Sequence, residues 1–259
     1  MTRPSFEHLD ELAETFAGAF PIWLGTDFDG TLTHHQDDPA GVELPDEMRV
    51  KLDRIARHPR FAVAVVSGRS LDDLLPRIGM AELAYAGNHG MEIEAQGLSW
   101  IDPEASRHKD LVGAFADVVG EFIRAVPGAR IEDKRLSLAI DYRPCSPAVR
   151  QAIVGRLDST IDRFPALRLR HAALGSEVLP RSGANKGTAA RVLRDHQVGG
   201  EGVAIYLGDD LTDEDAFRAL PNAITVHVGG QDTAARFRIE SADSVGLFFD
   251  WLVRVTQSG

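Results

Sequence analysis

The sequence predicts an α/β protein with a mostly parallel sheet and a smaller α+β unit inserted into it. Two observations predict this class. Short continuous apolar stretches alternate with amphipathic ones along most of the chain, which is typical of buried parallel strands separated by helices. Between residues 103 and 180 the rhythm changes to helix, two strands, helix and two strands, the pattern of a small antiparallel unit. We therefore expect a core from residues 1–102 and 181–259 and an inserted domain at 103–180.

The expected core elements follow from local patterns. An amphipathic stretch at residues 6–20 predicts a helix that packs on the core or mediates dimerisation. Apolar runs predict strands at residues 22–27, 61–68, 83–88, 203–210 and 223–229. Helical periodicity predicts helices at residues 45–58, 185–196, 212–220 and 244–255. These strands and helices alternate along the chain, as in a parallel sheet with helices on both faces.

The insert is predicted in the same way. Residues 103–126 read as one amphipathic helix, and residues 129–143 as two extended pieces around 133–135. A second helix is expected at residues 147–164. Two further strands are expected at 167–172 and 176–180, with Gly175 in the turn between them.

Composition limits the classes of function. The chain has 259 residues and a formal net charge of −11, and an acidic surface argues against a nucleic-acid partner. No apolar run reaches the ~18–20 residues of a membrane span, and acidic residues stand where a signal peptide carries basic ones. We therefore expect no membrane partner, a cytoplasmic location, and a monomer or weak dimer. Cys145 is the single cysteine, so no intrachain disulfide is possible.

The first string with chemical content is Asp27-Phe28-Asp29-Gly30-Thr31-Leu32, at the end of a predicted strand. The carboxyl ends of parallel strands line the ligand crevice, and alternation along an extended segment points Asp27 and Asp29 the same way. Such a pair suits Mg²⁺ and a carboxylate nucleophile, while Gly30 lets the backbone approach a phosphate. The alternative is a solvated acidic turn. The preceding apolar strand and the following Gly-Thr favour the site.

Two further strings are suited to an anion. Ser67-Gly68-Arg69 ends a predicted strand, and a serine hydroxyl with nearby N–H groups can bind a phosphate. Ser70 with Asp73 also fits a simple helix cap. Lys186 stands at the start of a predicted helix and offers a point charge for a phosphoryl group. By itself, a lone lysine is more often a surface residue.

The last string is acidic and runs from Gly208 to Asp215. Helix capping explains Thr212 and the acids that follow it. It does not explain Asp209 and Asp210, which stand at the carboxyl end of a predicted strand and are candidates for a Mg²⁺ shell.

In this order, the four strings resemble those of the haloacid-dehalogenase-like (HAD) phosphohydrolase superfamily, and the resemblance covers essentially the whole chain. It implies a Rossmann-like core with an inserted cap of the C2 type. A finer resemblance is to the trehalose-6-phosphate phosphatase family. The strings that carry it are DFDGTL, VVSGRSLDDL, YAGNHGMEI, IEDKRLSLAIDYR, EVLP with NKG, and YLGDDLTDEDAF. It implies an Mg²⁺-dependent hydrolase that converts trehalose 6-phosphate into trehalose and phosphate.

The resemblance also implies roles for residues. Asp27 would be the nucleophile, and Asp29 the general acid and then the base, which requires a pKa raised relative to that of Asp27. Lys186 would complete the catalytic set. Mg²⁺ would be held by Asp27, the Asp29 carbonyl and Asp209, with Asp213 nearby. The positions implied to bind phosphate or sugar are Gly30, Thr31, Ser67, Gly68, Arg69, Asn88, His89, Glu132, Lys134, Ser137 and Glu177.

Three departures from the family pattern bear on the substrate. Leu179 stands where the family commonly has a basic residue, Asp141 where it often has His, and Ala184-Asn185 where it often has Trp-Asp. All lie in or beside the predicted cap. Another glycosyl phosphate, such as a glucosylglycerol phosphate or a mannosyl- or glucosylglycerate phosphate, is therefore an alternative substrate.

Other classes fit less well. A phosphosugar mutase usually carries its cap between the first two motifs, where residues 33–62 leave too little chain. A catalytically silent sugar-phosphate sensor would be favoured by loss of Asp27, Asp29 or Lys186, and all three are present. A receiver domain is about half this length and lacks the insert.

Overall fold

The chain forms two compact units. The computed structural model describes residues 3–4, 9–36, 38–172 and 174–257. The larger unit consists of Met1–Trp100 and Ala184–Gly259, and the smaller unit is Ile101–Gly183. Within the described residues, no helix is long and apolar enough to span a bilayer.

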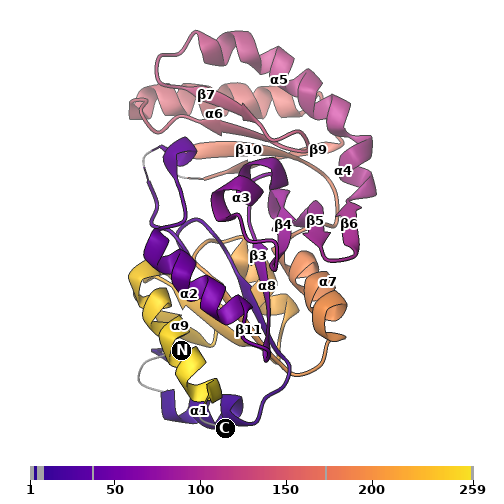
Figure 1. Cartoon of the computed structure of the whole chain (residues 1–259). Helices are drawn as coiled ribbons and strands as arrows, with labels where there is room; N and C mark the ends of the chain where they lie inside the picture. Colours follow the sequence, from indigo (N-terminus) through magenta and orange to yellow (C-terminus); the bar gives the residue numbers. More distant parts are fainter. Residues whose placement is uncertain (1–2, 5–8, 37, 173, 258–259) are drawn as a thin grey trace. The chain divides into compact units, whose positions relative to one another are not determined.

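The larger unit is built on a sheet of nine strands among the described residues (Figure 1). Their spatial order is β1 (Arg3–Pro4), β13 (Phe237–Ile239), β12 (Ile224–Val228), β11 (Val203–Gly208), β2 (Ile22–Thr26), β3 (Phe61–Val66), β4 (Ala84–Gly87), β5 (Glu92–Ala95) and β6 (Leu98–Ile101). In this spatial order, all neighbouring strands between β1 at one edge and β4 pair in parallel. Strand β5 pairs antiparallel with β4. The predicted fold class, α/β with a mostly parallel sheet, is confirmed.

Helices cover both faces of this sheet. One face packs on a cluster that includes residues of α1 (Leu9–Ala17), α2 (Asp46–Ala56), α3 (Leu71–Ile78) and α9 (Ala242–Gln257). The other face packs on residues of α7 (Lys186–Val198) and α8 (Asp213–Ala219). Strand β2 shows why the strands are continuously apolar: Ile22 and Leu24 join the first cluster, and Trp23 between them joins the second.

The smaller unit has two layers. Its antiparallel sheet has the order β7 (Arg130–Asp133), β8 (Leu138–Asp141), β10 (Gly175–Pro180) and β9 (Leu167–His171). Its helices are α4 (Pro103–Arg107), α5 (Lys109–Arg124) and α6 (Pro147–Ile161). Side chains from α5, α6 and one face of the sheet form a separate apolar core.

Several local predictions were wrong. The single helix expected at residues 103–126 is two helices, because His108 leaves helical geometry with φ −100° and ψ 6°. Gly175 begins β10 rather than lying in the turn before it. The strands β5 and β6 were not expected, because each is only four residues long. Ser70 stands at the N-cap of α3 but makes no side-chain capping bond.

The helix expected at residues 6–20 lies partly outside the described residues. Its described part, α1, ends at Ala17, and Phe16 is fully buried beside Trp251 of α9, with ring centroids 5.9 Å apart. Packing on the core, one of the two roles expected for this helix, is therefore observed.

The packing of α9 leads to a test of stability. Phe248 is fully buried and stacks on Trp251, so Phe248→Ala is expected to lower the free energy of unfolding by about 3–5 kcal/mol. The neighbouring Leu247 is 57% exposed, and Leu247→Ala is expected to change it by less than about 0.5 kcal/mol. Chemical denaturation followed by circular dichroism measures both. Equal effects of the two variants would contradict this packing.

Candidate active site

Four adjacent strands deliver polar side chains to one edge of the larger unit's sheet. Asp209, Asp27, Ser67 and Asn88 each directly follow the last residue of a strand, in the spatial order β11, β2, β3 and β4. Because these strands are parallel and in register, their carboxyl ends meet at the same edge. Residues far apart in the sequence are therefore neighbours there.

Asp27 lies in a buried, charged cluster. Lys186 Nζ, at the start of α7, lies 3.0 Å from Asp27 Oδ1 and 2.9 Å from Asp213 Oδ1. All three side chains are at most 5% exposed. The Tyr206 hydroxyl donates a hydrogen bond to Asp213 Oδ1 at 3.0 Å. The lysine therefore joins the end of β2 to the first turn of α8.

The cluster shifts the pKa values of its members. Burial raises the pKa of Asp27 well above its usual range, and the charge of Lys186 opposes this shift. Burial likewise raises the pKa of Asp213, again against Lys186. Burial would lower the pKa of Lys186, but the charges of Asp213 and Asp27 outweigh it and raise that pKa. Lys186 is therefore a permanent cation, and it favours the ionised form of both carboxyls.

Three of these carboxylates fit a divalent cation. Asp27, Asp209 and Asp213 each offer one oxygen, and the three oxygens lie within 4.8 Å of one another. Oxygen-only donor sets suit Mg²⁺, Ca²⁺ or Mn²⁺. With all three ionised and His35 neutral, these carboxylates and Lys186 carry a net charge of −2, which a divalent cation would balance.

The loop after β2 holds Asp209 in place. Thr31 Oγ1 donates to Asp209 Oδ1 at 3.3 Å, and His35 Nε2 lies 2.8 Å from Asp209 Oδ2. Gly30 has a φ of +82°, and a Cβ built there would lie 2.2 Å from Asp209 Oδ2. A side chain at position 30 would therefore displace the carboxylate.

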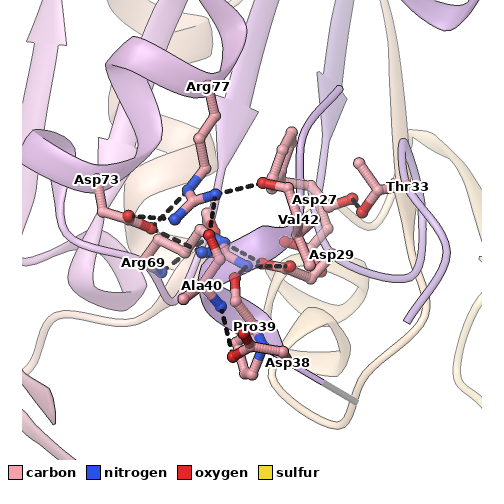
Figure 2. A network of polar contacts seen from close by, with 12 residues as sticks. Asp27, Asp29, Thr33, Asp38, Pro39, Ala40, Val42, Arg69, Asp73 and Arg77 are labelled. Atoms are coloured by element: carbon pink, nitrogen blue, oxygen red, sulfur yellow. Dashed lines mark hydrogen bonds and ion pairs between the residues drawn. The ribbon is translucent and has the colours of Figure 1, made fainter. Parts of the chain in front are cut away.

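Asp29 points elsewhere, contrary to the expectation that it shares a direction with Asp27. Figure 2 shows the guanidinium of Arg69 against its carboxylate, with Nε and Nη2 each 2.7 Å from one oxygen. This bidentate pair fixes the orientation of the Asp29 carboxylate. Asp29 is therefore held by an arginine, whereas Asp27 is held by Lys186.

The remaining predicted residues of the larger unit meet beside Arg69. The backbone N–H of Arg69 donates to Ser67 Oγ at 3.1 Å, and the Asn88 N–H donates to the Arg69 carbonyl at 2.6 Å. A Cβ on Gly68 would lie 2.5 Å from the His89 ring. Asn88 and His89 have left-handed φ values of 47° and 57°. Backbone strain of this kind at non-glycine residues is common at functional sites.

The predicted sugar-contacting residues of the smaller unit form their own group. Lys134 Nζ donates to Glu177 Oε1 at 3.0 Å, and Arg170 pairs with Glu177 Oε2 from the adjacent strand. The Lys134 N–H donates to the Ser137 carbonyl in the turn between β7 and β8. Glu132 and Glu177 both lie opposite Ala139 in the sheet register, so they share a face.

Sequence reasoning missed several contributors. His35, Tyr206, Asp73 and Arg170 contact predicted site residues, and Arg77 contacts Asp73. Tyr206 stands two residues before Gly208 in the strand that carries Asp209, which was a usable signal. His35 acts through a contact with a distant segment, for which the sequence offers no local sign. Asp73 forms i,i+4 pairs with Arg69 and Arg77, and Arg170 lies across from Glu177 on the adjacent strand, so their spacing was a usable signal.

Comparison with known proteins settles the family. The family model for trehalose-phosphatase matches residues 25–241. The chain belongs to this family. Among its relatives, "Probable trehalose-phosphate phosphatase 3" of Oryza sativa is 30% identical over 90% of this chain and 69% of its own length. The trehalose-phosphate phosphatase of Mycobacterium ulcerans is 34% identical over 86% of this chain and 59% of its own length.

Solved structures of the trehalose-phosphatase family share the fold. The C-terminal domain of trehalose-6-phosphate phosphatase from C. albicans has a TM-score of 0.82 and 21% identity, covering 98% of both chains. A structure of the Aspergillus fumigatus trehalose-6-phosphate phosphatase has a TM-score of 0.66 and 26% identity over the whole of both chains. The HAD-type architecture expected from the sequence is thereby confirmed.

The acidic cluster leads to a test of cation binding. Mg²⁺ at about 100 times its dissociation constant is expected to stabilise the chelator-treated protein by about 2.7 kcal/mol, seen as a rise in the thermal unfolding midpoint. Asp209→Asn should lose this response, because it removes a ligand from the triad. Asp210→Asn, which changes the exposed neighbour, should retain it. If Asp209→Asn kept the response to Mg²⁺ and Asp210→Asn lost it, this triad would be ruled out as the cation site.

Proposed function

We propose that the chain hydrolyses trehalose 6-phosphate to trehalose and phosphate, with Asp27 as the nucleophile. The observation that carries the proposal is the buried Asp27–Lys186–Asp213 cluster at the carboxyl edge of the sheet, in a member of the trehalose-phosphatase family. A buried carboxylate beside a fixed cation is suited to attack on phosphorus, because the lysine also attracts the phosphoryl oxygens.

In the first step, an Asp27 oxygen forms a bond to phosphorus while the bond from phosphorus to the sugar oxygen breaks. Asp29 supplies a proton to the departing oxygen, which leaves as a hydroxyl. Lys186 and Ser67 bind the phosphoryl oxygens, together with N–H groups of the Gly30–Thr31 and Gly68–Arg69 segments. The product of this step is a phosphate ester of Asp27.

In the second step, Asp29 accepts a proton from water, and the water oxygen forms a bond to phosphorus. The bond between phosphorus and Asp27 then breaks and releases inorganic phosphate. Two steps with lower barriers replace one difficult displacement. The same carboxyl returns to its starting protonation state.

We further propose that the cation is Mg²⁺, held by Asp27, Asp209 and Asp213, with the Asp29 carbonyl as an additional ligand. When bound, it supplies positive charge that offsets the charge of the phosphoryl group and of the carboxylates. The oxygen-only donor set supports this choice.

The smaller unit is proposed to be the cap that selects the sugar. Its residues Glu132, Lys134, Ser137 and Glu177 are proposed to hydrogen-bond sugar hydroxyls. The same role is proposed for Asn88 and His89. A site built for such bonds discriminates against substrates without hydroxyls, because its polar groups would be left unpaired.

The alternative substrate is another glycosyl phosphate. Asn185 caps α7 through Thr188, with Asn185 Oδ1 accepting from the Thr188 N–H at 2.8 Å, so its departure from the family pattern is explained by local structure. Asp141 pairs with Arg130 and Arg143. Leu179 places no charge where the family commonly has a basic residue. The departures that bear on sugar choice are therefore Leu179, Asp141 and Ala184.

The reaction is tested by phosphate release from a panel of sugar phosphates with Mg²⁺. Trehalose 6-phosphate is expected to be the best substrate, and Asp27→Asn to be inactive, because an amide cannot form the phosphoryl ester. Asp53→Asn, on the outer helix α2, serves as the control and should keep full activity. Faster turnover of a glycosylglycerol or glycosylglycerate phosphate would overturn the substrate, and an active Asp27→Asn the mechanism.

Sugar recognition is tested at Glu177. Glu177→Gln removes the charge that Lys134 and Arg170 compensate. The KM for trehalose 6-phosphate is expected to rise about 10- to 100-fold, corresponding to the ~1.5–3 kcal/mol of a charged hydrogen bond. Hydrolysis of p-nitrophenyl phosphate, which has no sugar hydroxyls, should be unchanged. Glu121→Gln on α5 is the control, and an unchanged KM in Glu177→Gln would argue against a role in sugar binding.

A further inference from the structure

Asp29 belongs to a chain of ion pairs that extends away from the phosphate-binding edge. Arg69 binds both oxygens of Asp29, and its Nη1 lies 2.7 Å from Asp73 Oδ2. Arg77 in turn binds Asp73, with Nε 2.9 Å from Oδ2 and Nη2 2.6 Å from Oδ1. Figure 2 shows these side chains in one continuous network.

The network is also attached to the loop before α2. Arg69 Nη2 donates to the Pro39 carbonyl at 2.9 Å. Arg77 Nη1 donates to the Ala40 carbonyl at 3.1 Å and to the Val42 carbonyl. The two arginines therefore bind three backbone carbonyls in or next to the single helical turn η2 (Pro39–Gly41).

Arg69 has little freedom to follow Asp29 if that side chain turns. Its side chain is 9% exposed, and four of its N–H groups are committed to Asp29, Asp73 and Pro39. The guanidinium carbon also lies 5.6 Å from the centre of the Phe28 ring. The guanidinium is thus a fixed platform, and its planar fork determines where the Asp29 oxygens lie.

Asp73 is the centre of this platform. Burial would raise the pKa of Asp73, but the hydrogen bonds from Arg77 and Arg69 outweigh burial and lower it. Its carboxylate is therefore ionised at neutral pH and binds both guanidinium groups. Loss of its charge would leave two partly buried arginines facing each other without an anion between them.

We propose that Asp73 and Arg77 are positioning residues for Asp29, acting through Arg69. The inference rests on the proposed function, in which Asp29 serves the leaving oxygen of the sugar. Neither Asp73 nor Arg77 is assigned to contact with substrate or cation, and their effect is transmitted by the orientation of one guanidinium. A misplacement of about 1 Å in a catalytic group is sufficient to slow a reaction 10²-fold.

The simpler reading is that Asp73 and Arg77 form an ordinary helix-stabilising pair, four residues apart on α3. Exposed pairs of that kind contribute about 0.3–0.5 kcal/mol. Here the side chains of Arg69 and Arg77 are 9% and 15% exposed, and both also bind loop carbonyls. The two readings differ in which substrates would be affected, and this difference is the basis of the test.

The experiment compares two leaving groups in Asp73→Asn. p-Nitrophenolate departs without a proton, whereas a sugar alkoxide needs one from Asp29. We expect kcat/KM for trehalose 6-phosphate to fall by about tenfold or more, part of the 10²–10⁴ that a general acid contributes. For p-nitrophenyl phosphate, kcat/KM should change less than about threefold. Because kcat/KM reports steps up to release of the leaving group, water attack does not confuse the comparison.

A matched control is available on α2, where Asp53 and Arg57 form the same i,i+4 pair, with Asp53 Oδ1 2.8 Å from Arg57 Nε. Asp53→Asn should leave both substrates unchanged. Asp73→Glu, which keeps the charge, should recover part of the loss, and Arg77→Gln should reproduce the selective loss if Asp73→Asn folds poorly.

Equal losses for both substrates in Asp73→Asn and Arg77→Gln would show a structural role only and overturn the inference. Unchanged rates for both would overturn it as well. Failure of the proposed function is seen separately, in the wild type: a chain that hydrolyses p-nitrophenyl phosphate but not trehalose 6-phosphate contradicts the substrate, and the comparison then uses the best sugar phosphate of the panel.

Discussion

A buried lysine between two buried carboxylates is the interaction on which the larger unit's site depends. Lys186 compensates Asp27 and Asp213 where neither is open to solvent. Removal of one partner from a buried pair leaves an uncompensated charge, which destabilises a protein by about 3–5 kcal/mol. The ends of β2, α7 and α8 are thus held together by charge as well as by apolar packing. A phosphoryl group would meet a cation that is already in place.

The two aspartates of the first motif are two residues apart and have different surroundings. Asp27 is buried with a lysine and two other carboxylates. Asp29 is partly exposed and bound by an arginine that belongs to a second network. The chain gives the two carboxyls different environments by turning the second one away from the acidic cluster. The cluster and the arginine network can therefore change independently.

The fold and the residues at the sheet edge could be predicted from the sequence, because both depend on local patterns. Apolar strands of five or six residues followed by Asp27, Ser67 or Asp209 show where the carboxyl edge lies. What could not be predicted depends on contacts between distant segments. Arg69 lies 40 residues from Asp29, and nothing near either residue shows that they pair. The break at His108 also has no local sign, because the residues around it favour a helix as much as the rest of the stretch does.

The smaller unit is made from one uninterrupted stretch of chain, Ile101–Gly183, and it has its own apolar core. Replacing this one segment of the gene would therefore replace the whole sheet of the smaller unit at once. Asp27, Lys186 and the acidic cluster would be left as they are. If the smaller unit selects the sugar, as proposed, a change confined to this one segment would alter the sugar preference without altering the residues proposed to carry out the reaction.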